Sequence, residues 1–375
     1  MNEIEKLIQE LCPDGVEYRR LGEVASIKTG KGITQKDCFE DAEYPVMSGG
    51  KTPMGRYTIF NRDSNTVTIS RVGAYAGFVS FLEERFYCND KCFSVIPKED
   101  IELKPKYLFY VLKQKEELIK NLQSEGGVPT INTQKVGGIE IPLPPITIQE
   151  KIVEILDKFT SLEAELEAEL EARRKQYEYY REKLLTFSPE DENVRWATLG
   201  EICENYDSKR RAITASKRTK GTFPYYGASG IVDYVEGYIF DGNYLLISED
   251  GANLLARSTP IAFSINGKNW VNNHAHILKF KEIATQKMVE YYINMIDLTR
   301  YISGGAQPKL NQENLNRIPI PLPPLSEQRR IVAILDRFEA LTNDLQAGLP
   351  AEIAARRQQY EYYREKLLTF KRKTV

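Results

Sequence analysis

His274 and His276 are the two histidines of the chain, and both lie in the segment NNHAH. An H-x-H pair on a strand directs both rings to one face, where imidazole nitrogens can bind a metal. No carboxylate cluster at ligand spacing joins them, so we expect a structural or base-contacting role and no metal site. The neighbouring motif Ser248-Glu249-Asp250 is too short to predict a nuclease.

The five cysteines do not have the paired spacing of a zinc site or of a disulfide framework. Only Cys88 and Cys92 are close in sequence, and we expect reduced, mostly buried thiols. Walker A, Rossmann GxGxxG, GxSxG and N/D-P-P-Y/F motifs are also missing from the sequence. The sequence therefore predicts a chain without a catalytic site of its own. An enzyme that acts through the NNHAH segment is the alternative.

Basic side chains gather in polar loops together with glycine, serine, asparagine and tyrosine. Six of them lie between residues 209 and 220, directly before the segment PYYGASG. Cations reach phosphates, while amide and hydroxyl groups reach base edges, so we predict that two sets of loops bind nucleic acid. The predicted residues are Lys28, Lys31, Lys51, Arg56, Arg71, Tyr75, Asn89 and Lys91 in the first half, and Lys209, Arg210, Arg211, Lys217, Arg218, Tyr225, Tyr226, Ser229, Asn253, Arg257, Asn273 and His274 in the second.

The overall composition does not by itself favour a nucleic-acid partner. The chain has 51 basic and 53 acidic residues and a formal net charge of −2, so binding must depend on local patches. Its 375 residues are enough for two or three domains. No apolar run approaches the ~20 residues of a membrane helix, and the acidic start MNEIEKLIQELC is not typical of a signal peptide. We expect a cytoplasmic protein.

An internal repeat organises the elements that must position these loops. The segment IEIPLPPITIQEKIVEILDKF from Ile139 matches IPIPLPPLSEQRRIVAILDRF from Ile318, at an offset of 318 − 139 = 179 residues. Farther along, RRKQYEYYREKLLTF and RRQQYEYYREKLLTF differ only at Lys175 and Gln358. Between these matching ends the sequences have drifted apart. A common frame around two divergent inserts predicts two equivalent domains. Duplicated domains drift wherever nothing holds them, but drift alone would not spare the helices while changing the domains.

Each proline-rich turn precedes the apolar spacing of a long helix. The first run, from Ile148 to Leu166, has the spacing of a coiled-coil seam and continues after one four-residue step, a stutter. The second run, from Ile331 through Leu345, is interrupted by Gly-Leu-Pro at 348–350, where we expect a break or kink. We expect the two helices to pair with each other in antiparallel fashion. Pairing with a partner chain is the alternative.

Residues 162–172 read LEAE-LEAE-LEA, a tandem four-residue unit. This composition is a good helix former with a solvated glutamate face. One added unit would lengthen the helix by about 6 Å and rotate everything beyond it by about 40°. That rotation is close to the ~34–36° twist of one base pair of B-DNA. The stretch is therefore either helix filler or a ruler that sets the spacing between two DNA-binding domains.

Each half also has the pattern of a mixed α/β domain. An amphipathic helix is predicted at 105–121 in the first half and at 286–301 in the second. The predicted strands are 66–70, 77–82 and 92–96, followed in the second half by 244–248, 261–265 and 276–280.

The IPLPP turns, the segments QEKIVEILDKF and QRRIVAILDRF, the repeated QYEYYREKLL and the opening LCPDGVEYRRLGEV resemble the DNA specificity subunit of type I restriction–modification systems. The resemblance covers essentially the whole chain. It implies an α+β fold in which two mixed α/β target recognition domains are separated by two long helices that form an antiparallel coiled coil, in an internal pseudo-two-fold repeat. The implied boundaries are 1–140 and 189–317 for the two domains, and 141–188 and 318–375 for the two spacer helices.

The resemblance also implies a function. Each target recognition domain would read one half of a bipartite, asymmetric DNA site, while the helices set the gap and dock two modification (methyltransferase) subunits. Those subunits carry S-adenosylmethionine and methylate adenine, and restriction subunits, which translocate and cut DNA, can join them; this chain holds no cofactor. A coiled-coil scaffold that binds only protein is the alternative. The predicted docking residues are Pro144, Pro145, Gln149, Tyr177, Tyr180, Pro323, Pro324, Gln328, Tyr360 and Tyr363.

Overall fold

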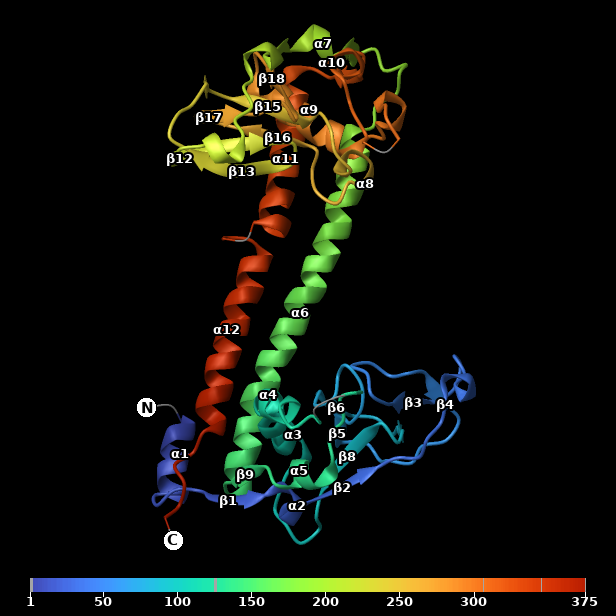
Figure 1. Cartoon of the computed structure of the whole chain (residues 1–375), viewed down its shortest axis with the longest axis vertical. Coiled ribbons are helices and arrows are strands. Elements are labelled where there is room, and N and C mark those ends of the chain that lie inside the picture. Colours follow the sequence, from blue (N-terminus) through green and yellow to red (C-terminus); the bar gives the residue numbers. More distant parts are fainter. Residues whose placement is uncertain (1–2, 125–126, 306, 345, 375) are drawn as a thin grey trace. The chain divides into compact units, whose positions relative to one another are not determined.

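The computed structural model describes residues 3–124, 127–305, 307–344 and 346–374 (Figure 1). The chain divides into two compact units, one made of residues 1–167 and 352–375 and the other of residues 168–351. We call them unit 1 and unit 2 and describe each by itself. Unit 1 therefore combines the first domain with a segment from the end of the sequence.

Unit 1 is a mixed α/β domain with short elements. Its strands are β1 Glu17–Arg20, β2 Ala25–Thr29, β3 Tyr44–Met47, β4 Arg56–Tyr57, β5 Thr66–Ser70, β6 Val79–Leu82, β7 Tyr87–Cys88, β8 Cys92–Pro97 and β9 Glu140–Leu143. Its helices are α1 Glu3–Leu11, α2 Leu21–Val24, α3 Pro105–Gln114, α4 Glu116–Lys120, α5 Thr133–Gly137, the first part of α6 Ile146–Leu185, and most of α12 Leu349–Leu368.

Unit 2 repeats this series of elements. Its strands are β10 Arg195–Thr198, β11 Glu204–Asn205, β12 Lys220–Gly227, β13 Gly230–Val235, β14 Phe240–Asp241, β15 Tyr244–Ser248, β16 Ala262–Ile265, β17 Lys268–Val271, β18 Ala275–Lys279 and β19 Pro319–Leu322. Its helices are α7 Leu199–Ile202, α8 Asn253–Ala256, α9 Ile283–Met295, α10 Gln312–Asn316, α11 Leu325–Asn343 and the last part of α6.

The sheets of the two units have matching topologies. Unit 1 has an antiparallel sheet in the order β2-β8-β5-β6, and unit 2 has one in the order β11-β18-β15-β16. The central strands β5 and β15 are buried along their whole length, which fits their run of β-branched and apolar residues. A second small sheet, β4-β3-β7 in unit 1 and β13-β12-β17-β14 in unit 2, carries loops beside the first. The duplication predicted from the sequence is therefore confirmed in the fold.

The repeated sequence segments frame each domain in the same way. Strand β1 pairs with β9, and β10 pairs with β19, both antiparallel and over four residues. The short helices α5 and α10 are preceded by Asn132 and Asn311, whose side chains each accept a hydrogen bond from a main-chain amide three residues later. This is the N-cap interaction that asparagine favours. Matching residues therefore make matching local structures at the base of both domains.

Most predicted strands and helices are present, with shifted ends. Strands β5 and β15 are confirmed at both ends. Strand β6 begins two residues late, because Gly77 has φ +95° and turns the chain before it. The helix predicted at 105–121 is two helices separated at Lys115, whose backbone leaves the helical region. The helix predicted at 286–301 ends at Met295, because the Asp297 carboxylate accepts hydrogen bonds from Thr299 and holds a turn there.

Helix α6 is continuous over 40 residues, and the predicted stutter is wrong. One series of buried or half-buried positions alternates in steps of three and four along its length. Glu163 and Arg173 occupy two of these positions, so a pattern built from apolar residues alone missed them. Leu162, predicted in the seam, is 45% exposed. The series is Gln149, Ile152, Leu156, Phe159, Glu163, Leu166, Leu170, Arg173, Tyr177, Tyr180 and Leu184.

The predicted break in the second helical run is confirmed. Helix α11 ends at Asn343 and α12 begins at Leu349. The carboxylate of Asp344 accepts hydrogen bonds from two amides of the connecting turn. Pro350 lies in the first turn of α12, where its missing N–H costs no intrahelical hydrogen bond. Leu345, predicted in the seam, lies outside the described residues.

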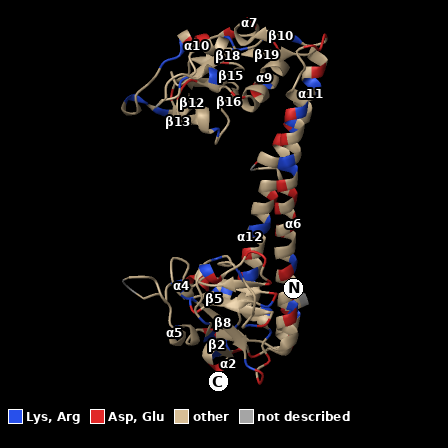
Figure 2. Cartoon of the chain, turned by 90° about the vertical axis from the view of Figure 1, so that its right-hand side faces the viewer, with Lys and Arg blue, Asp and Glu red and all other residues tan. Residues whose placement is uncertain are grey.

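Within unit 1, helices α6 and α12 pack in antiparallel fashion, as predicted (Figure 1). The rings of Phe159 and Tyr363 stack with their centroids 5.4 Å apart. Farther along α6, the Arg357 guanidinium of α12 forms ion pairs with Glu163 and Glu167. Residue numbers thus rise along α6 while they fall along α12. Figure 2 colours the acidic and basic residue positions, which occur along the ribbons of both helices.

Within unit 2, the last part of α6 packs on α11. The ring of Phe338 stacks on Tyr180, with centroids 5.7 Å apart, and lies 6.2 Å from the ring of Tyr177. Aromatic rings from the repeated QYEYY segments therefore make the same kind of contact in each unit. In the parts of the chain that the structure describes, no helix is both long and apolar enough to cross a membrane.

Candidate nucleic-acid interface

The loops that carry the predicted binding residues are held in the same way in both units. In unit 1 the Ser70 hydroxyl donates to the carbonyl of Gly50 (3.0 Å), and in unit 2 the Ser248 hydroxyl donates to the carbonyl of Ala228 (2.5 Å). A Cβ atom on Gly49 would lie 2.2 Å from the carbonyl oxygen of Val72, so a larger residue does not fit there. Small residues let the two loops meet at the end of the central strand in each domain.

Unit 1 brings several of its predicted residues together. The Lys51 ammonium lies 5.2 Å from the ring centroid of Tyr75, and both side chains are exposed. Lys28, Lys31 and Lys91 are also exposed. None of these lysines forms an ion pair with any residue that the structure describes, so their charges remain available to an anion.

Three other predicted residues of unit 1 have roles inside the domain. Asn89 is 1% exposed, and its side-chain amide donates to the carbonyl of Ile33 (2.8 Å). Because its side chain is buried and hydrogen-bonded within unit 1, we leave Asn89 out of the candidate interface. The guanidinium of Arg56 donates to main-chain carbonyls at Ala42 and Glu43 and is half-buried. Arg71 is also half-buried and donates to a main-chain carbonyl.

In unit 2 a hollow of about 650 Å³ gathers predicted residues from four segments of the sequence. The hollow is lined by both exposed and half-buried side chains. Arg218 forms an ion pair with Asp233 (3.3 Å) at its edge, and Tyr226 lies next to it with its ring on Phe263. The predicted residues that line the hollow are Arg218, Tyr225, Ser229, Asn253, Asn273 and His274.

The ring of His274 has a fixed orientation at this hollow. Its Nδ1 atom lies 2.9 and 3.0 Å from the two carboxylate oxygens of Asp250, and its main-chain amide donates to the side chain of Asn272 (2.8 Å). The His274 side chain is 52% exposed. A ring held at Nδ1 leaves Nε2 to meet a ligand. Asp250, which the sequence interpretation did not include, is therefore part of the candidate site.

Three basic residues of the loop between β11 and β12 point into solvent. Lys209, Arg211 and Lys217 are exposed, and none has an ion-pair partner in the described ranges. The Lys209 ammonium lies 3.9 Å from the ring centroid of Tyr206. The Trp270 indole N–H donates to the main-chain carbonyl of Arg211 (2.6 Å) and fixes the loop without using the guanidinium.

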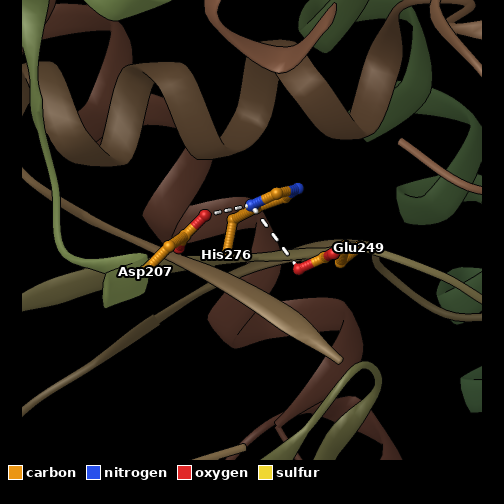
Figure 3. A group of neighbouring side chains, drawn as sticks. All are labelled: Asp207, Glu249 and His276. Carbon is orange, nitrogen blue, oxygen red and sulfur yellow. Dashed lines mark hydrogen bonds and ion pairs between the residues drawn. The ribbon is translucent and has the colours of Figure 1, made fainter. Parts of the chain in front are cut away.

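Arg210 points in the opposite direction, into the domain. Its guanidinium lies 2.7 Å from the Glu249 carboxylate and 3.4 Å from that of Asp207. His276 lies between these two acids, with Nδ1 2.6 Å from Asp207 and 3.9 Å from Glu249 (Figure 3). Lys309 reaches Glu249 at 3.2 Å. Because the Arg210 side chain is only 12% exposed and is committed to this charge network, we leave it out of the candidate interface.

The charge network keeps both acids ionised. Burial alone would raise the pKa of the Asp207 carboxyl, but hydrogen bonds from His276 and the main-chain amide of Ile277, together with the charge of Arg210, lower it below its ordinary value. Burial would likewise raise the pKa of the Glu249 carboxyl, and the hydrogen bond from Arg210 and the charge of His276 lower it. Paired carboxylates in a partly buried site are stable only with such compensation.

The same three side chains have the spacing of metal ligands, since Asp207, Glu249 and His276 offer atoms within 4.8 Å of one another. However, Arg210 and Lys309 already neutralise the carboxylates. The Nε2 atom of His276 faces the main-chain carbonyl of Leu310 at 2.7 Å. These contacts favour an internal ion-pair network over metal binding.

Three further predicted residues of unit 2 hold the domain together. Tyr225 is 1% exposed, and its hydroxyl accepts the amide of Ile213 (2.9 Å). The side chain of Asn253 binds both main-chain groups of Thr259 (3.0 and 3.1 Å). The guanidinium of Arg257 donates to three main-chain carbonyls at 3.1 to 3.2 Å. Because their polar groups already have partners within unit 2, we leave these three residues out of the candidate interface.

The predicted docking residues also include internal ones. Gln149 is fully buried and binds the main chain at Glu102, Lys104 and Pro144 (2.9 Å each). Its repeat partner Gln328 is 6% exposed and donates to the carbonyl of Pro323. The helix aromatics Tyr177, Tyr180, Tyr360 and Tyr363 pack on Phe338 or Phe159. Of the prolines, Pro144 and Pro323 are buried, whereas Pro145 and Pro324 are exposed.

The exposed aromatics of the repeated helix segment are two residues that the sequence interpretation left out. Tyr179 is 58% exposed in unit 2, and Tyr362, its repeat partner, is 60% exposed in unit 1. Each ring has a lysine four residues later beside it, Lys183 at 5.7 Å and Lys366 at 6.0 Å. The 3-4 spacing of the seam, traced through the charged positions, would have separated these outward-facing tyrosines from the inward-facing ones.

Two equivalent mixed α/β domains, each with a loop surface that offers unpaired cations, define a duplicated recognition protein built on a helical frame. The family model of the type I restriction modification DNA specificity domain matches residues 13–172 and again residues 192–355. The chain therefore belongs to the family of type I restriction–modification specificity subunits.

Known proteins of this family are similar to the chain, some over its whole length and others over part of it. The specificity subunit of the Escherichia coli type I restriction enzyme EcoR124I/EcoR124II is 31% identical and aligns over 99% of this chain and 97% of its own length. A putative type I specificity subunit from Haemophilus influenzae is 40% identical over about half of each chain (50% and 48%). The solved structure of the S subunit from M. genitalium has the same fold, with a TM-score of 0.66, 20% identity and coverage of 94% and 96% of the two chains.

Proposed function

We propose that this chain is the non-catalytic, DNA-binding specificity subunit of a type I restriction–modification complex in the cytoplasm. Each unit reads one half of a bipartite, asymmetric DNA site. One observation carries the proposal: in the two units, equivalent loops are connected to equivalent strands but have different side chains. Two sequences can be read by two such surfaces, because direct readout depends on the side chains that reach the base edges.

The proposed DNA surface is smaller than the one predicted from the sequence. It keeps the exposed cations and polar groups and excludes residues that are buried or committed to internal hydrogen bonds. Lysines and arginines position the duplex through phosphates, and the hydroxyl, amide and imidazole groups read bases. The proposed residues are Lys28, Lys31, Lys51, Tyr75 and Lys91 in unit 1, and Lys209, Arg211, Lys217, Ser229, Asn273 and His274 in unit 2.

The repeated helix segments are the proposed docking sites for two modification subunits. Tyr179 and Tyr362 present the same exposed side chain in the same sequence context, once in each unit. A partner that binds twice needs such a duplicated surface. S-adenosylmethionine is then bound by the modification subunits, which methylate adenine, and restriction subunits join the same complex.

The tandem LEAE unit is proposed to set the gap between the half-sites. Arg357 forms ion pairs with Glu163 and Glu167, which occupy the same position in two successive units. A change in the number of units therefore leaves a glutamate opposite Arg357. The helix contact tolerates the change in length that a ruler requires.

The test uses the complex assembled with its modification subunits. Adenine methylation is mapped across a genome, and binding to the recovered site is measured as a function of salt. The variant Lys209→Ala/Arg211→Ala is expected to weaken binding and reduce the salt slope by about 2, since each lost phosphate contact contributes ~0.9. The matched control Lys281→Ala/Arg317→Ala removes two exposed charges, one just after β18 and one just before β19, and should leave the slope unchanged. Intact binding by the first variant would instead support the protein-only scaffold.

A further inference from the structure

Two equivalent positions at the central sheet hold side chains of different charge and polarity in the two units. Strand pairing aligns Ile69 with Phe93 in unit 1 and Ile247 with His276 in unit 2. Two residues after each isoleucine stand Arg71 and Glu249. Their main chains make the same pair of hydrogen bonds at 2.8 to 2.9 Å, one to the strand end and one to the loop near the repeat boundary. The residues are therefore structural equivalents.

The side chains at these equivalent positions work differently. In unit 1 the Arg71 guanidinium lies 5.8 Å from the ring centroid of Phe93 and donates outward to the carbonyl of Asp90 (3.1 Å). In unit 2 the acid and the imidazole lie side by side (Figure 3), and Arg210 points inward and forms an ion pair with Glu249. Unit 1 thus has Arg71 at this position, whereas unit 2 has Glu249, which holds Arg210 inside the domain.

The network in unit 2 joins four separate segments of the sequence. Asp207 and Arg210 belong to the loop after β11, Glu249 follows β15, His276 lies in β18, and Lys309 precedes α10. Each acid has cationic or N–H partners within 3.4 Å, and the side chains of Asp207, Arg210 and His276 are no more than 12% exposed. A paired charge network of this kind fixes geometry more than it adds stability.

The loop held by this network carries the exposed cations of unit 2. Lys209 and Arg211 flank Arg210 directly, and they face solvent while Arg210 faces the network. Arg210 also donates to the main-chain carbonyl of Ala275 (2.6 Å), two residues from the exposed Asn273. Any shift of Arg210 would therefore move its basic neighbours and disturb the segment that carries Asn273 and His274.

We propose that Asp207, Arg210, Glu249 and His276 are positioning residues that determine which bases unit 2 reads. They set the conformation of the loop from Asp207 to Lys217 against the 272–275 turn, without touching DNA themselves. Unit 1, with Arg71 and Phe93 at the equivalent positions, holds its loops by other contacts. The inference rests on the proposed function, because it assumes that unit 2 reads one half-site.

The experiment measures half-site discrimination by the assembled complex. Duplexes carry the full site recovered by methylation mapping, or a scrambled first or second half-site, and affinity is measured over a range of salt concentrations. Arg210→Gln is expected to reduce discrimination at the half-site of unit 2 about tenfold, ~1.4 kcal/mol, and to leave the other half-site unchanged. The salt slope is expected to stay constant, because Arg210 makes no phosphate contact.

Two further variants separate positioning from folding. Arg210→Lys keeps the charge but has a single ammonium in place of the forked guanidinium, so it should restore discrimination in part. Glu249→Gln weakens the network while Arg210 keeps its bonds to Asp207 and Ala275, and it should give the same loss at the same half-site. If Arg210→Gln fails to fold, half-site discrimination by Glu249→Gln alone tests the inference.

The outcomes are distinct. A salt slope reduced by about 1 in Arg210→Gln would make Arg210 a direct phosphate contact and overturn the inference. Unchanged discrimination in Glu249→Gln, in a complex that melts like the wild type, would overturn it too. If the wild-type complex discriminates neither half-site, the proposed function itself fails, and the inference fails with it.

Discussion

Insertion of one LEAE unit after Glu169 should lengthen the gap between the two half-sites by about one base pair. The insertion adds 4 × 1.5 Å, about 6 Å, to helix α6 and rotates the residues beyond it by about 40°. In the uninterrupted 3-4 series of α6, four added residues make a stutter, which locally unwinds the helix pair. In a seven-residue repeat, deletion of the four residues Leu166–Glu169 shifts the register as three added residues would. This is a stammer, which overwinds the helix pair, so the insertion should perturb assembly less than the deletion.

The assay maps methylated adenines in cells that express each variant with the same modification subunits. The wild type gives one gap, and the insertion variant should give the same two half-sites with a longer gap. A matched control replaces residues 166–169 by Leu-Ala-Ala-Ala, which keeps the helix length and removes two charges. The ruler is refuted if the insertion variant methylates sites with the wild-type gap, or if the control changes the gap.

Three further results are expected. The stability of unit 2 should fall as the pH drops below about 5, because folding lowers the pKa values of the Asp207 and Glu249 carboxyls. Their contribution to stability is complete above the pKa of ~4 that such carboxyls have in the unfolded chain. It is lost as the pH falls through their lower pKa values in the folded state. In a thermal melt, Glu249→Gln should show a shallower acid dependence. Dialysis against EDTA should leave the melting temperature unchanged, since Arg210 and Lys309 engage the carboxylates; a lower value would indicate a bound metal. Phe338→Ala should cost about 2 kcal/mol in urea unfolding, below the ~3–5 of a fully buried ring, and no loss would contradict its stacking on Tyr180.

The frame could be predicted from the sequence because its signals are local. Prolines, caps and apolar spacing fix the turns and helices, and the Gly-Leu-Pro segment marks the break between α11 and α12, with Pro350 in the first turn of α12. The seam was less predictable. Glu163 and Arg173 sit at seam positions although they are charged, and one of them is satisfied by Arg357, nearly 200 residues away in sequence.

The binding surface was harder to predict, because side-chain direction within a loop depends on distant partners. Lys209, Arg210 and Arg211 look alike in sequence, yet the acids at 207 and 249 bring the middle one inside. The motif Ser248-Glu249-Asp250 is too short to predict a nuclease. In the structure, each of its three side chains holds a different part of the site. No local signal identifies such roles, since they arise only when β15 and β18 pair.

Unit 1 is completed by helix α12, which belongs to the second sequence repeat, and unit 2 contains residues 168–185 of α6, which belongs to the first. The chain thus has the architecture of a domain-swapped dimer fused into one polypeptide. A half-length chain with one domain and one helix would need a helix from a second copy to build the same unit. Such a homodimer has two-fold symmetry and would meet a palindrome. A single polypeptide that holds both units is free of that symmetry, so residues as different as Arg71 and Glu249 can occupy equivalent positions.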